Sequence, residues 1–321
     1  MTAKRSVALQ LAFVAALGAL LAGMAVTAHD NLLRQGIATG FGFLFARTGW
    51  DVSASFLPHS PADPYWWTFV VGLCNTLALS IVCIVLATGA GLCLALLGVG
   101  RSRVPRGFAR LYVWTFRNIP LIVQVFFWYH VTRQLPPVRQ ALEFFGCCYA
   151  SNRGIYLPRV AFESGRLELS MPTLQGFNFA GGTHVSPEFM ALVAAIVAYN
   201  IAFVAEIINS GIRSVPANQV EAARIIGLSD ARTFWKITVP QAIRVAIPPL
   251  VSQYISLTKS TSLAIAIGYT DLFSVGVIAI NHTGQSLDVI AVLMLVYLVV
   301  SLGISALGNA CNRAVAARGA R

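Results

Sequence analysis

The stretch Trp66–Val99 reads WWTFVVGLCNTLALSIVCIVLATGAGLCLALLGV and contains no Lys, Arg, Asp, Glu or His. A hydrocarbon core of about 30 Å is crossed by about 20 apolar helical residues, so this stretch predicts a transmembrane helix. The whole chain has the same character, because 57% of its 321 residues are hydrophobic and only 11% are charged. Soluble domains carry about 25% charged residues. This composition argues against a soluble enzyme, a disordered chain and a nucleic-acid-binding domain.

Further apolar stretches predict an all-α polytopic membrane protein with about six transmembrane helices. One stretch begins near Val245, breaks around 259–262 and continues as Leu263–Ile280, which is interrupted by glycine and aspartate. This pattern predicts a broken or partly re-entrant segment. The other predicted spans are Ser6–Ala28, Leu111–Val131, Glu188–Ile212 and Val289–Ala310.

The first stretch also resembles a signal peptide, since Lys4 and Arg5 precede it and it ends in the small-residue sequence Val26-Thr27-Ala28. Signal peptides have an apolar region of about 7–15 residues. Ser6–Ala28 is longer, and we therefore expect an uncleaved first span.

The basic residues set the orientation, because Lys and Arg gather in short cytoplasmic loops. With both termini in the cytoplasm of a bacterial cell with an inner membrane, most Lys and Arg residues fall on the inner side. These are Lys4, Arg5, Arg101, Arg103, Arg106, Arg110, Arg213, Arg224, Arg232, Lys236, Arg244, Arg313, Arg318 and Arg321.

The spans divide the chain into three parts. Residues 1–65 are the first span and an outer loop, 66–312 are the transmembrane domain, and 313–321 are a cytoplasmic tail. The domain includes an outer insertion, 132–187, and a cytoplasmic segment, 213–244. An insertion this long is rarely a mere connection. It is either a cap over the outer mouth or a docking surface for a soluble partner. Adjacent Cys147 and Cys148 predict no disulfide bridge.

The cytoplasmic segment contains Glu221-Ala222-Ala223, then Gly227 after three intervening residues, and Ile237-Thr238-Val239-Pro240 after nine more. Ser214 or Asn218 is expected to cap a short helix, and Ser229 or Asp230 a second one. Gly227 permits the turn between them, because glycine adopts positive φ without strain. Proline at 240 ends the second helix or opens the next membrane segment. The pattern predicts two short helices that project from the membrane, with small alanines that allow close approach by another protein.

This signature resembles the E-A-A loop of ABC importer permeases. Neighbouring sequences resemble the polar amino-acid permeases, and most closely the general L-amino-acid branch. These sequences are Phe116–Gln124, Ala205–Ile207, Gly211–Pro216, Tyr254–Leu263 and Ala266–Tyr269, and the resemblance covers about residues 31–311. Asn118 stands where a glycine is frequent in the wider family.

The resemblance implies a type I importer permease without enzymatic activity of its own. Its partners would be a second permease subunit, two ABC ATPase subunits, a periplasmic amino-acid-binding protein and membrane lipid, with no nucleic acid. Glu221, Ala222, Ala223, Gly227 and Pro240 would form the ATPase-coupling site. This chain needs no cofactor itself, since ATP would be held by the ATPases. Consistently, it has no G-x-x-x-x-G-K-[ST] motif, and its histidines show no metal-ligand spacing.

Arg117 and Glu206 are predicted at membrane depth, each about 10 Å from the inner ends of their helices at 1.5 Å per residue. Charges at this depth usually face a partner or a wet path. We expect the two side chains to pair or to line the same cavity, and a purely structural buried pair is the alternative. Pro120 disturbs the helix here.

A path for a zwitterion needs hydrogen-bond donors and acceptors. The candidate pathway residues are Arg117, Asn118, Gln124, Asn200, Glu206, Lys259, Thr261 and Ser262. Lys259 is alternatively a structural cation that faces helix carbonyls or the partner permease. The Gly268–Asp271 sequence is either a gate or bend, or a simple helix terminus.

Two rival classes fit the sequence less well. An ATP-independent secondary transporter or channel explains the spans and the buried charges. It does not explain the signature from Glu221 to Pro240, and no internal repeat is visible. An intramembrane enzyme would need paired catalytic groups or a metal cluster, and Asp271 has no evident acidic companion.

Overall fold

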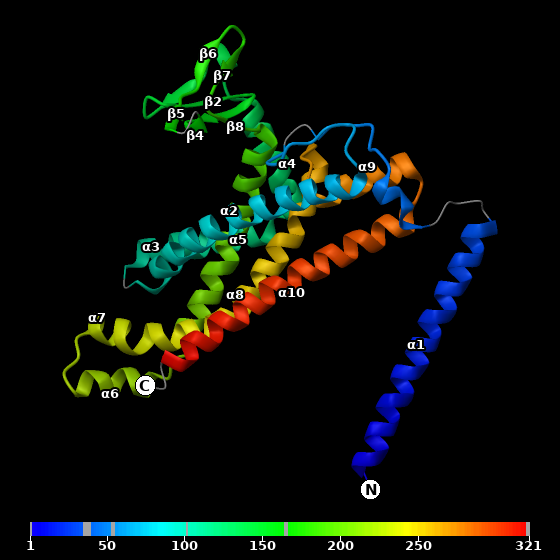
Figure 1. Ribbon diagram of the computed structural model, residues 1–321. Helices are drawn as coiled ribbons and strands as arrows, with labels where there is room; N and C mark the ends of the chain where they lie inside the picture. The colour runs from blue at the N-terminus through cyan, green and yellow to red at the C-terminus, as the bar shows by residue number, and fades with distance from the viewer. Residues whose placement is uncertain (1, 35–39, 53–54, 101, 164–165, 319–321) are drawn as a thin grey trace.

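The computed structural model describes residues 2–34, 40–52, 55–100, 102–163 and 166–318, and the described chain is mostly helical (Figure 1). The helical elements, in which η3 is a π-helix and η1, η2 and η4 are 3₁₀ helices, have the following bounds: α1 (Thr2–Arg34), η1 (Phe41–Phe45), α2 (Tyr65–Val99), α3 (Arg103–Asn118), α4 (Leu121–Arg133), η2 (Val138–Gln140), α5 (Pro187–Arg213), α6 (Ala217–Ile225), α7 (Asp230–Thr233), η3 (Phe234–Thr238), α8 (Val239–Ser260), η4 (Thr261–Ile267), α9 (Leu272–Thr283) and α10 (Ser286–Arg318).

Three of these helices, α2, α5 and α10, are long and apolar enough to cross a membrane. The helical path Asp230–Ile267 passes the same test together with α9, and the two are bent by 51° at the break between them. The described chain therefore has three spanning helices, or four when the bent pair counts as one. The predicted count of about six is not confirmed.

The predicted span Leu111–Val131 is divided into two helices at Pro120, where the sequence predicted a disturbed helix. Helix α3 ends at Asn118 and α4 begins at Leu121, with Pro120 between them. Proline lacks an N–H, and it forces the preceding residue toward an extended backbone. Ile119 accordingly has φ −91° and ψ 122°. The two helices are 16 and 13 residues long, so neither reaches the length of a spanning helix.

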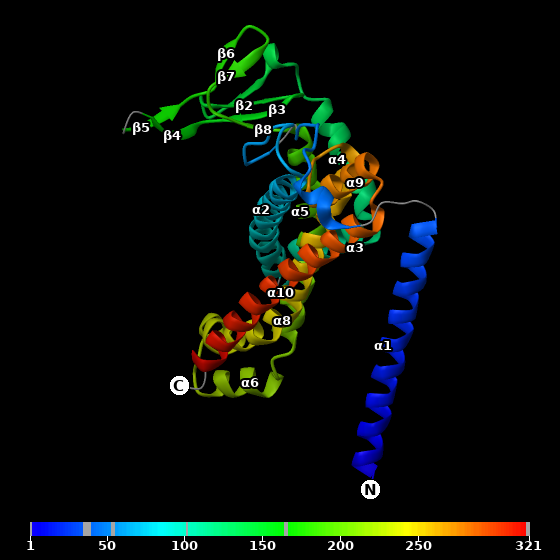
Figure 2. The ribbon, with the colours of Figure 1, turned by 45° about the vertical axis from the view of Figure 1, so that its right-hand side comes forward.

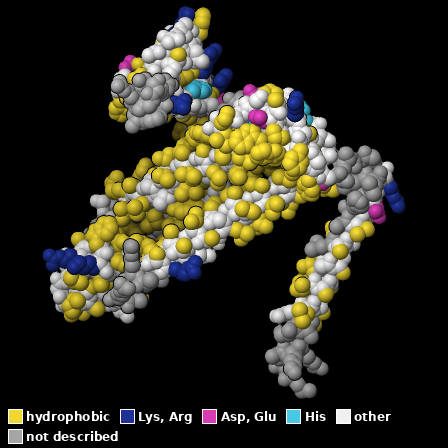
Figure 3. All heavy atoms as spheres, in the orientation of Figure 1, with side chains coloured by type: hydrophobic (Ala, Val, Ile, Leu, Met, Phe, Trp, Pro, Cys, Tyr) yellow, Lys and Arg dark blue, Asp and Glu magenta, His cyan; other side chains and the backbone are white. Residues whose placement is uncertain are grey.

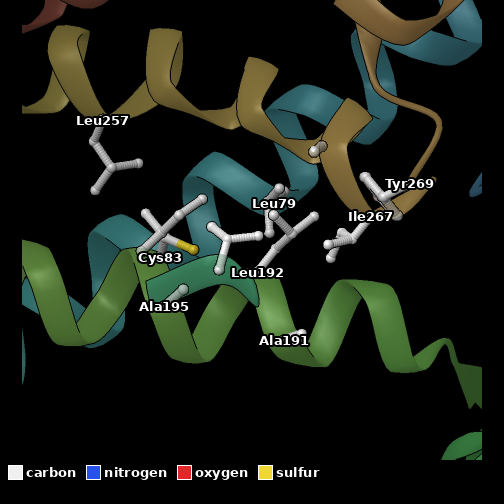
Figure 4. Packing of buried hydrophobic residues seen from close by; sticks show 11 residues of the cluster. Leu79, Cys83, Ala191, Leu192, Ala195, Leu257, Ile267 and Tyr269 are labelled. Atoms are coloured by element: carbon white, nitrogen blue, oxygen red, sulfur yellow. The ribbon is translucent and has the colours of Figure 1, made fainter. Parts of the chain in front are cut away.

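The core lies where α2, α5, α8 and η4 meet (Figure 4). Leu79 and Cys83 of α2 pack against Leu192 of α5, and all three are fully buried. Helices α2 and α5 approach closely at Gly91, where an added Cβ would lie 2.6 Å from a methyl group of Val204. The side chain of Cys83 fills space in this core, as expected of a small apolar residue.

The bend at 268–271 joins η4 to α9 and is tied to α2. Gly268, with φ +80°, ends η4 in the left-handed conformation, and Asp271 caps α9 by accepting the Ser274 N–H at 2.9 Å. From α2, the Asn75 amide donates to the Thr270 carbonyl at 2.7 Å, and the Thr76 hydroxyl accepts the Leu272 N–H at 3.0 Å. A broken segment is present as predicted, but the break lies here and not at 259–262, where the chain stays helical and passes from α8 into η4.

The all-α prediction is wrong for the outer insertion. Between α4 and α5, residues 134–186, here called the insert, form eight short strands and the small helix η2. A four-stranded antiparallel sheet has the order β1-β2-β3-β8, and two separate hairpins pair β4 with β5 and β6 with β7. The strand bounds are β1 (Leu142–Phe144), β2 (Cys148–Ser151), β3 (Gly154–Leu157), β4 (Arg159–Glu163), β5 (Arg166–Ser170), β6 (Thr173–Gln175), β7 (Asn178–Ala180) and β8 (Thr183–Val185).

The surface separates an apolar band from charged ends. Hydrophobic side chains cover the visible face of the helical body, and Lys and Arg lie mainly toward its two ends (Figure 3). The insert lies at one end of this body and the α6–α7 pair at the other, while α1 stands apart from the other helices (Figure 1, Figure 2). An apolar band between polar ends is suited to a lipid bilayer.

Candidate functional site

A cavity of about 580 Å³ opens between α2, α3 and α5. Its wall includes three arginines and, among the lining residues, a single acidic one. The lining residues are Leu94, Gly98, Ala109, Arg110, Val113, Trp114, Arg117, Asn118, Phe203, Ala205, Glu206, Asn209 and Arg213.

The polar wall follows from helical spacing, since residues three or four apart lie on the same side of a helix. Helix α3 contributes Arg110, Trp114 and Arg117, which are four and three residues apart. Helix α5 contributes Phe203, Glu206, Asn209 and Arg213 at steps of three, three and four. Sequence reasoning selected Arg117 and Glu206 as a pair but missed Trp114, Phe203 and Asn209. The same spacing could have found all three.

Arg117 and Glu206 line this cavity together, as one form of the sequence hypothesis expected. In the described part of the chain no salt bridge joins them. The Arg117 guanidinium carbon instead lies 4.9 Å from the centre of the Phe203 ring. A cation over an aromatic face is attracted by the ring's negative surface and becomes oriented by it. The guanidinium is thus held at the wall by an aromatic ring, and both charges remain available to a ligand.

The break between α3 and α4 shapes the cavity's edge. Asn118, the last residue of α3, lines the cavity, and its amide donates to the Trp114 carbonyl at 2.6 Å. Gln124 is buried, and its amide donates to the carbonyls of Phe116 and Ile119, both at 3.1 Å. These carbonyls lack a helical partner because the helix stops at the proline. Gln124 therefore clamps the break and is absent from the cavity wall.

Lys259, Thr261 and Ser262 lie away from the cavity, at the junction of α8 and η4. The Thr261 hydroxyl is buried and donates to the Thr258 carbonyl, and the Ser262 hydroxyl donates to the Lys259 carbonyl. Asn200 is buried as well, and it accepts an amide hydrogen bond from Gln253 of α8 at 2.8 Å. The structure thus divides the predicted pathway residues into a group that lines the cavity and a group that lies outside it.

The second candidate site is the α6–α7 loop, which contains the E-A-A signature. Glu221 and Ala222 are exposed on α6, whereas Ala223 is buried. Gly227 turns the chain with φ +85°, and the Leu228 N–H donates to the Ala223 carbonyl at 3.0 Å. This is the left-handed helix end that favours glycine. The signature residues therefore place a tight turn at the end of α6.

The ends of the two short helices differ in part from the prediction. Pro216 precedes α6 as its N-cap residue without a side-chain hydrogen bond, and the Ser214 hydroxyl donates to the Gly211 carbonyl of α5. The predicted cap by Ser214 or Asn218 is therefore wrong, because proline already sets the backbone at the helix start. Ser229 is the N-cap residue of α7, as expected, but it makes no side-chain cap bond.

Two polar contacts hold the loop together. Arg224 Nε donates to Asp230 Oδ1 at 3.0 Å, which joins α6 to α7. The Gln241 amide of α8 donates to the Gln219 side-chain carbonyl at 2.7 Å. Pro240 lies in the first turn of α8, so it opens the membrane segment and does not end a separate helix.

Large apolar side chains are exposed on this loop. Ile225 is 84%, Ile226 78% and Trp235 63% exposed. Sequence reasoning missed them, because each belongs to an apolar pattern that a buried helix would also show. Exposed apolar side chains of this size are typical of a surface that another protein or a membrane covers.

A metal site is not supported in the described residues, since no group of three or more His, Cys, Asp or Glu side chains could hold an ion. The two sites thus offer a cavity with charged and amide side chains between apolar helices, and an exposed apolar loop on one chain. Together they are typical of the permease class of membrane transporter, in which an embedded path is joined to a surface for a soluble subunit.

The chain belongs to the family described as the binding-protein-dependent transport system inner membrane component, whose sequence profile matches residues 87–319. It is therefore a multi-pass inner-membrane permease and not a member of an enzyme class. The match begins within α2 and includes the cavity helices, the insert and the α6–α7 loop.

Two curated relatives resemble nearly the whole chain. The putative amino-acid ABC transporter permease protein YhdX of Escherichia coli (strain K12) is 37% identical, over 89% of this chain and 88% of that protein. The general L-amino acid transport system permease protein AapQ of Rhizobium johnstonii is 33% identical, over 89% of this chain and 86% of that protein.

Solved structures show the same fold. A chain of a crystallised amino acid ABC transporter determined with histidines aligns with a TM-score of 0.58 and 25% identity, over 78% of this chain and 94% of that chain. A chain of the inward-facing MetNI methionine ABC transporter aligns with a TM-score of 0.54 over 78% of this chain and 97% of that chain. At 17% identity, this second likeness concerns the fold alone.

Proposed function

We propose that this permease imports L-amino acids and couples the motion of ABC ATPases to their translocation through the E-A-A loop. The observation that carries the proposal is the exposed apolar loop, Ile225, Ile226 and Trp235, placed directly after the cavity helix α5. The amino-acid transport permeases among its relatives support the substrate class.

In this proposal the cavity receives the zwitterion. The guanidinium groups of Arg110 and Arg117 suit the substrate carboxylate, because Arg pairs with carboxylates through two parallel hydrogen bonds. Glu206 suits the ammonium group. Asn118 and Asn209 add neutral amides at the same wall. This chain's contribution is to supply opposite charges on facing helices and to keep them unpaired with each other.

The loop's role is mechanical. Glu221 and Ala222 face outward on α6, and Gly227 brings α7 back beside it. An ATPase groove would cover Ile226 and Trp235, so that its movement displaces the loop. Helix α5 enters the loop at Arg213, and α8 leaves it at Val239. A displacement therefore reaches the cavity wall through α5.

The assembly would contain a second permease, two ATPase subunits and a soluble amino-acid-binding protein. Both termini and the loop would face the cytoplasm, with the insert outside. The basic residues of the inner segments support this orientation. Gln124, Lys259, Thr261 and Ser262 would shape the path indirectly, by holding the helix breaks and ends that surround it.

The test is uptake of a labelled amino-acid mixture by liposomes that contain the complete importer. We would compare Gly227→Val with Gly227→Asn. A β-branched residue is strained at φ +85°, whereas Asn tolerates the left-handed region. We expect Gly227→Val to lose ATP-driven uptake and ATPase association, and Gly227→Asn to keep most of both.

Uptake that proceeds without ATP would contradict the proposal and favour a secondary transporter. Equal activity of the two variants would show that the turn does not transmit ATPase motion. Gly303→Ala serves as a control for glycine replacement in the membrane, since an added Cβ at Gly303 meets no atom within 4 Å.

A further inference from the structure

The insert has a rigid frame of its own. The Phe179 ring stacks on Tyr149 with a centroid distance of 4.7 Å and lies 4.6 Å from the Tyr156 ring. The Tyr156 hydroxyl donates to Asn178 at 2.7 Å. These contacts fix the β6–β7 hairpin on the four-stranded sheet. A surface fixed in advance loses little entropy when a partner binds.

The insert is joined directly to α4 and to the cavity helix α5. It leaves α4 after Arg133 and returns to α5 at Pro187. The Arg133 guanidinium donates to the Asn152 carbonyl at 3.4 Å, and the Asn152 N–H donates to the Pro136 carbonyl at 2.9 Å. The insert and the α6–α7 pair occupy opposite ends of the molecule (Figure 1). A protein bound to the insert would therefore act on α5 from the end opposite the ATPases.

One edge of the insert combines an aromatic ring, an aliphatic side chain and a free cation. We name it the 139–177 edge and define it by Arg139, Leu174 and Phe177. Phe177 is 73% exposed at the β6–β7 turn, and the Arg139 guanidinium carbon lies 4.3 Å from its ring centre. Leu174 and Arg139 also line a groove of about 340 Å³.

The positive charge of Arg139 at this edge has no acidic partner among the described residues of the chain. Arg139 is the single charged residue among those that line the groove. In the described residues its guanidinium makes no hydrogen bond or ion pair, so its N–H donors remain available while the ring orients it. Arg and large aromatic side chains dominate the binding energy of many protein interfaces. The edge fits a partner that offers a carboxylate beside an apolar contact.

We propose that the 139–177 edge docks the soluble binding protein of this importer, with Arg139 pairing with a carboxylate of that protein and Phe177 packing beside it. This inference rests on the proposed function, which places the insert outside. The family description itself names a binding protein, and the insert projects beyond the helices at the end opposite the α6–α7 pair. We expect the carboxylate to come from the partner, because none of the described residues that line the groove is acidic.

The experiment uses the complete importer in lipid nanodiscs and its binding protein loaded with the labelled amino acid. The dissociation constant of the binding protein from the importer is measured for the wild-type permease and three variants. The variants are Arg139→Glu, Phe177→Ser and a matched control, Arg159→Glu. The control makes the same charge change at an exposed arginine on the separate β4–β5 hairpin. We expect Arg139→Glu and Phe177→Ser each to weaken binding about tenfold, as truncated hot spots do, and Arg159→Glu to bind like wild type.

Equal binding by all four proteins would overturn the proposal. An equal loss for Arg139→Glu and Arg159→Glu would overturn it too, since it would indicate general charge attraction. The proposal would also be overturned if the Arg139→Glu and Phe177→Ser variants altered the contact between two permease chains and left the affinity for the binding protein unchanged. Bound ATPase and an unchanged melting temperature verify that each variant is folded. Uptake by the wild-type importer in the same preparation separates the two proposals. Uptake that does not need ATP would refute the proposed function. ATP-driven uptake, together with unchanged affinity of the Arg139→Glu variant for the binding protein, would refute the docking surface alone.

Discussion

The cavity and the α6–α7 loop both depend on the end of α5, but different forces hold them. Glu206 and Asn209 line the cavity, and α5 ends at Arg213, four residues before α6 begins. The cavity's charged groups are positioned by neighbours in the same chain, as Arg117 is by Phe203. The loop's Ile226 has no such cover and is 78% exposed. Substitutions in the cavity should therefore alter substrate handling, whereas substitutions on the loop should alter assembly with the ATPases.

The largest effect is expected from a charge on the loop's apolar surface. Ile226→Asp would place an unpaired carboxylate under the ATPase. We expect uptake and ATPase association to fall about a hundredfold, because burying an unpaired charge is costly. ATPase association is measured by co-purification. Val104→Asp is the control, since Val104 is 83% exposed at the start of α3 and outside the loop. If Ile226→Asp and Val104→Asp lost uptake and ATPase association equally, the loop would not be the specific binding surface for the ATPase.

The next effect should come from the cavity. Glu206→Gln removes the acidic group from the described cavity wall while keeping its shape. We expect the amino-acid concentration for half-maximal uptake to rise about tenfold, as for a lost hydrogen bond to a charged group. ATPase co-purification should stay normal. If Glu206→Gln instead releases the ATPases, the separation between cavity and loop fails.

A smaller effect, on stability, is expected at the break beside the cavity. Gln124→Leu leaves the carbonyls of Phe116 and Ile119 without a side-chain donor. A buried unsatisfied polar group costs about 1–3 kcal/mol, so the thermal unfolding midpoint in detergent should drop. Phe126→Leu, an exposed position on the same helix, serves as the control. Unchanged unfolding of Gln124→Leu would show that the break needs no clamp.

The smallest effect is expected at the ion pair between α6 and α7. Arg224 and Asp230 are both about half exposed. Exposed pairs contribute at most about 1 kcal/mol and are weakened by salt. Arg224→Ala should therefore leave the unfolding midpoint nearly unchanged, most clearly at high salt. A large loss of stability would mean that the loop is held chiefly by this pair.

The sequence predicted the elements that depend on apolar length. Trp66–Val99 became α2, Tyr65–Val99, and Glu188–Ile212 became α5, Pro187–Arg213, because uninterrupted hydropathy and helix length go together. The broken segment near Asp271 was also predicted, since glycine and aspartate interrupt the apolar run there. The turn at Gly227 followed from glycine's tolerance of positive φ.

Other features were hidden from hydropathy. The Leu111–Val131 stretch is apolar on both sides of Pro120, so hydropathy alone indicates one span, and only the proline predicted the disturbed helix that the structure shows as a break. The insert's strands are only three to five residues long, too short for clear alternation, and β1 is exposed throughout. The exposure of Trp235 was not predicted, because the surface that would cover it belongs to another protein in the proposed assembly.

The central claim is that the loop transmits ATPase motion to the cavity. It is tested most directly by placing a single cysteine at Trp114, an exposed residue of the cavity wall, after the six native cysteines are replaced. Reaction of Trp114→Cys with a polar maleimide is measured in the complete importer, without nucleotide and trapped with ATP and vanadate. The account predicts that trapping changes the reaction rate, and that Gly227→Val abolishes the difference. Identical rates in both states, with the ATPases still bound, would contradict it.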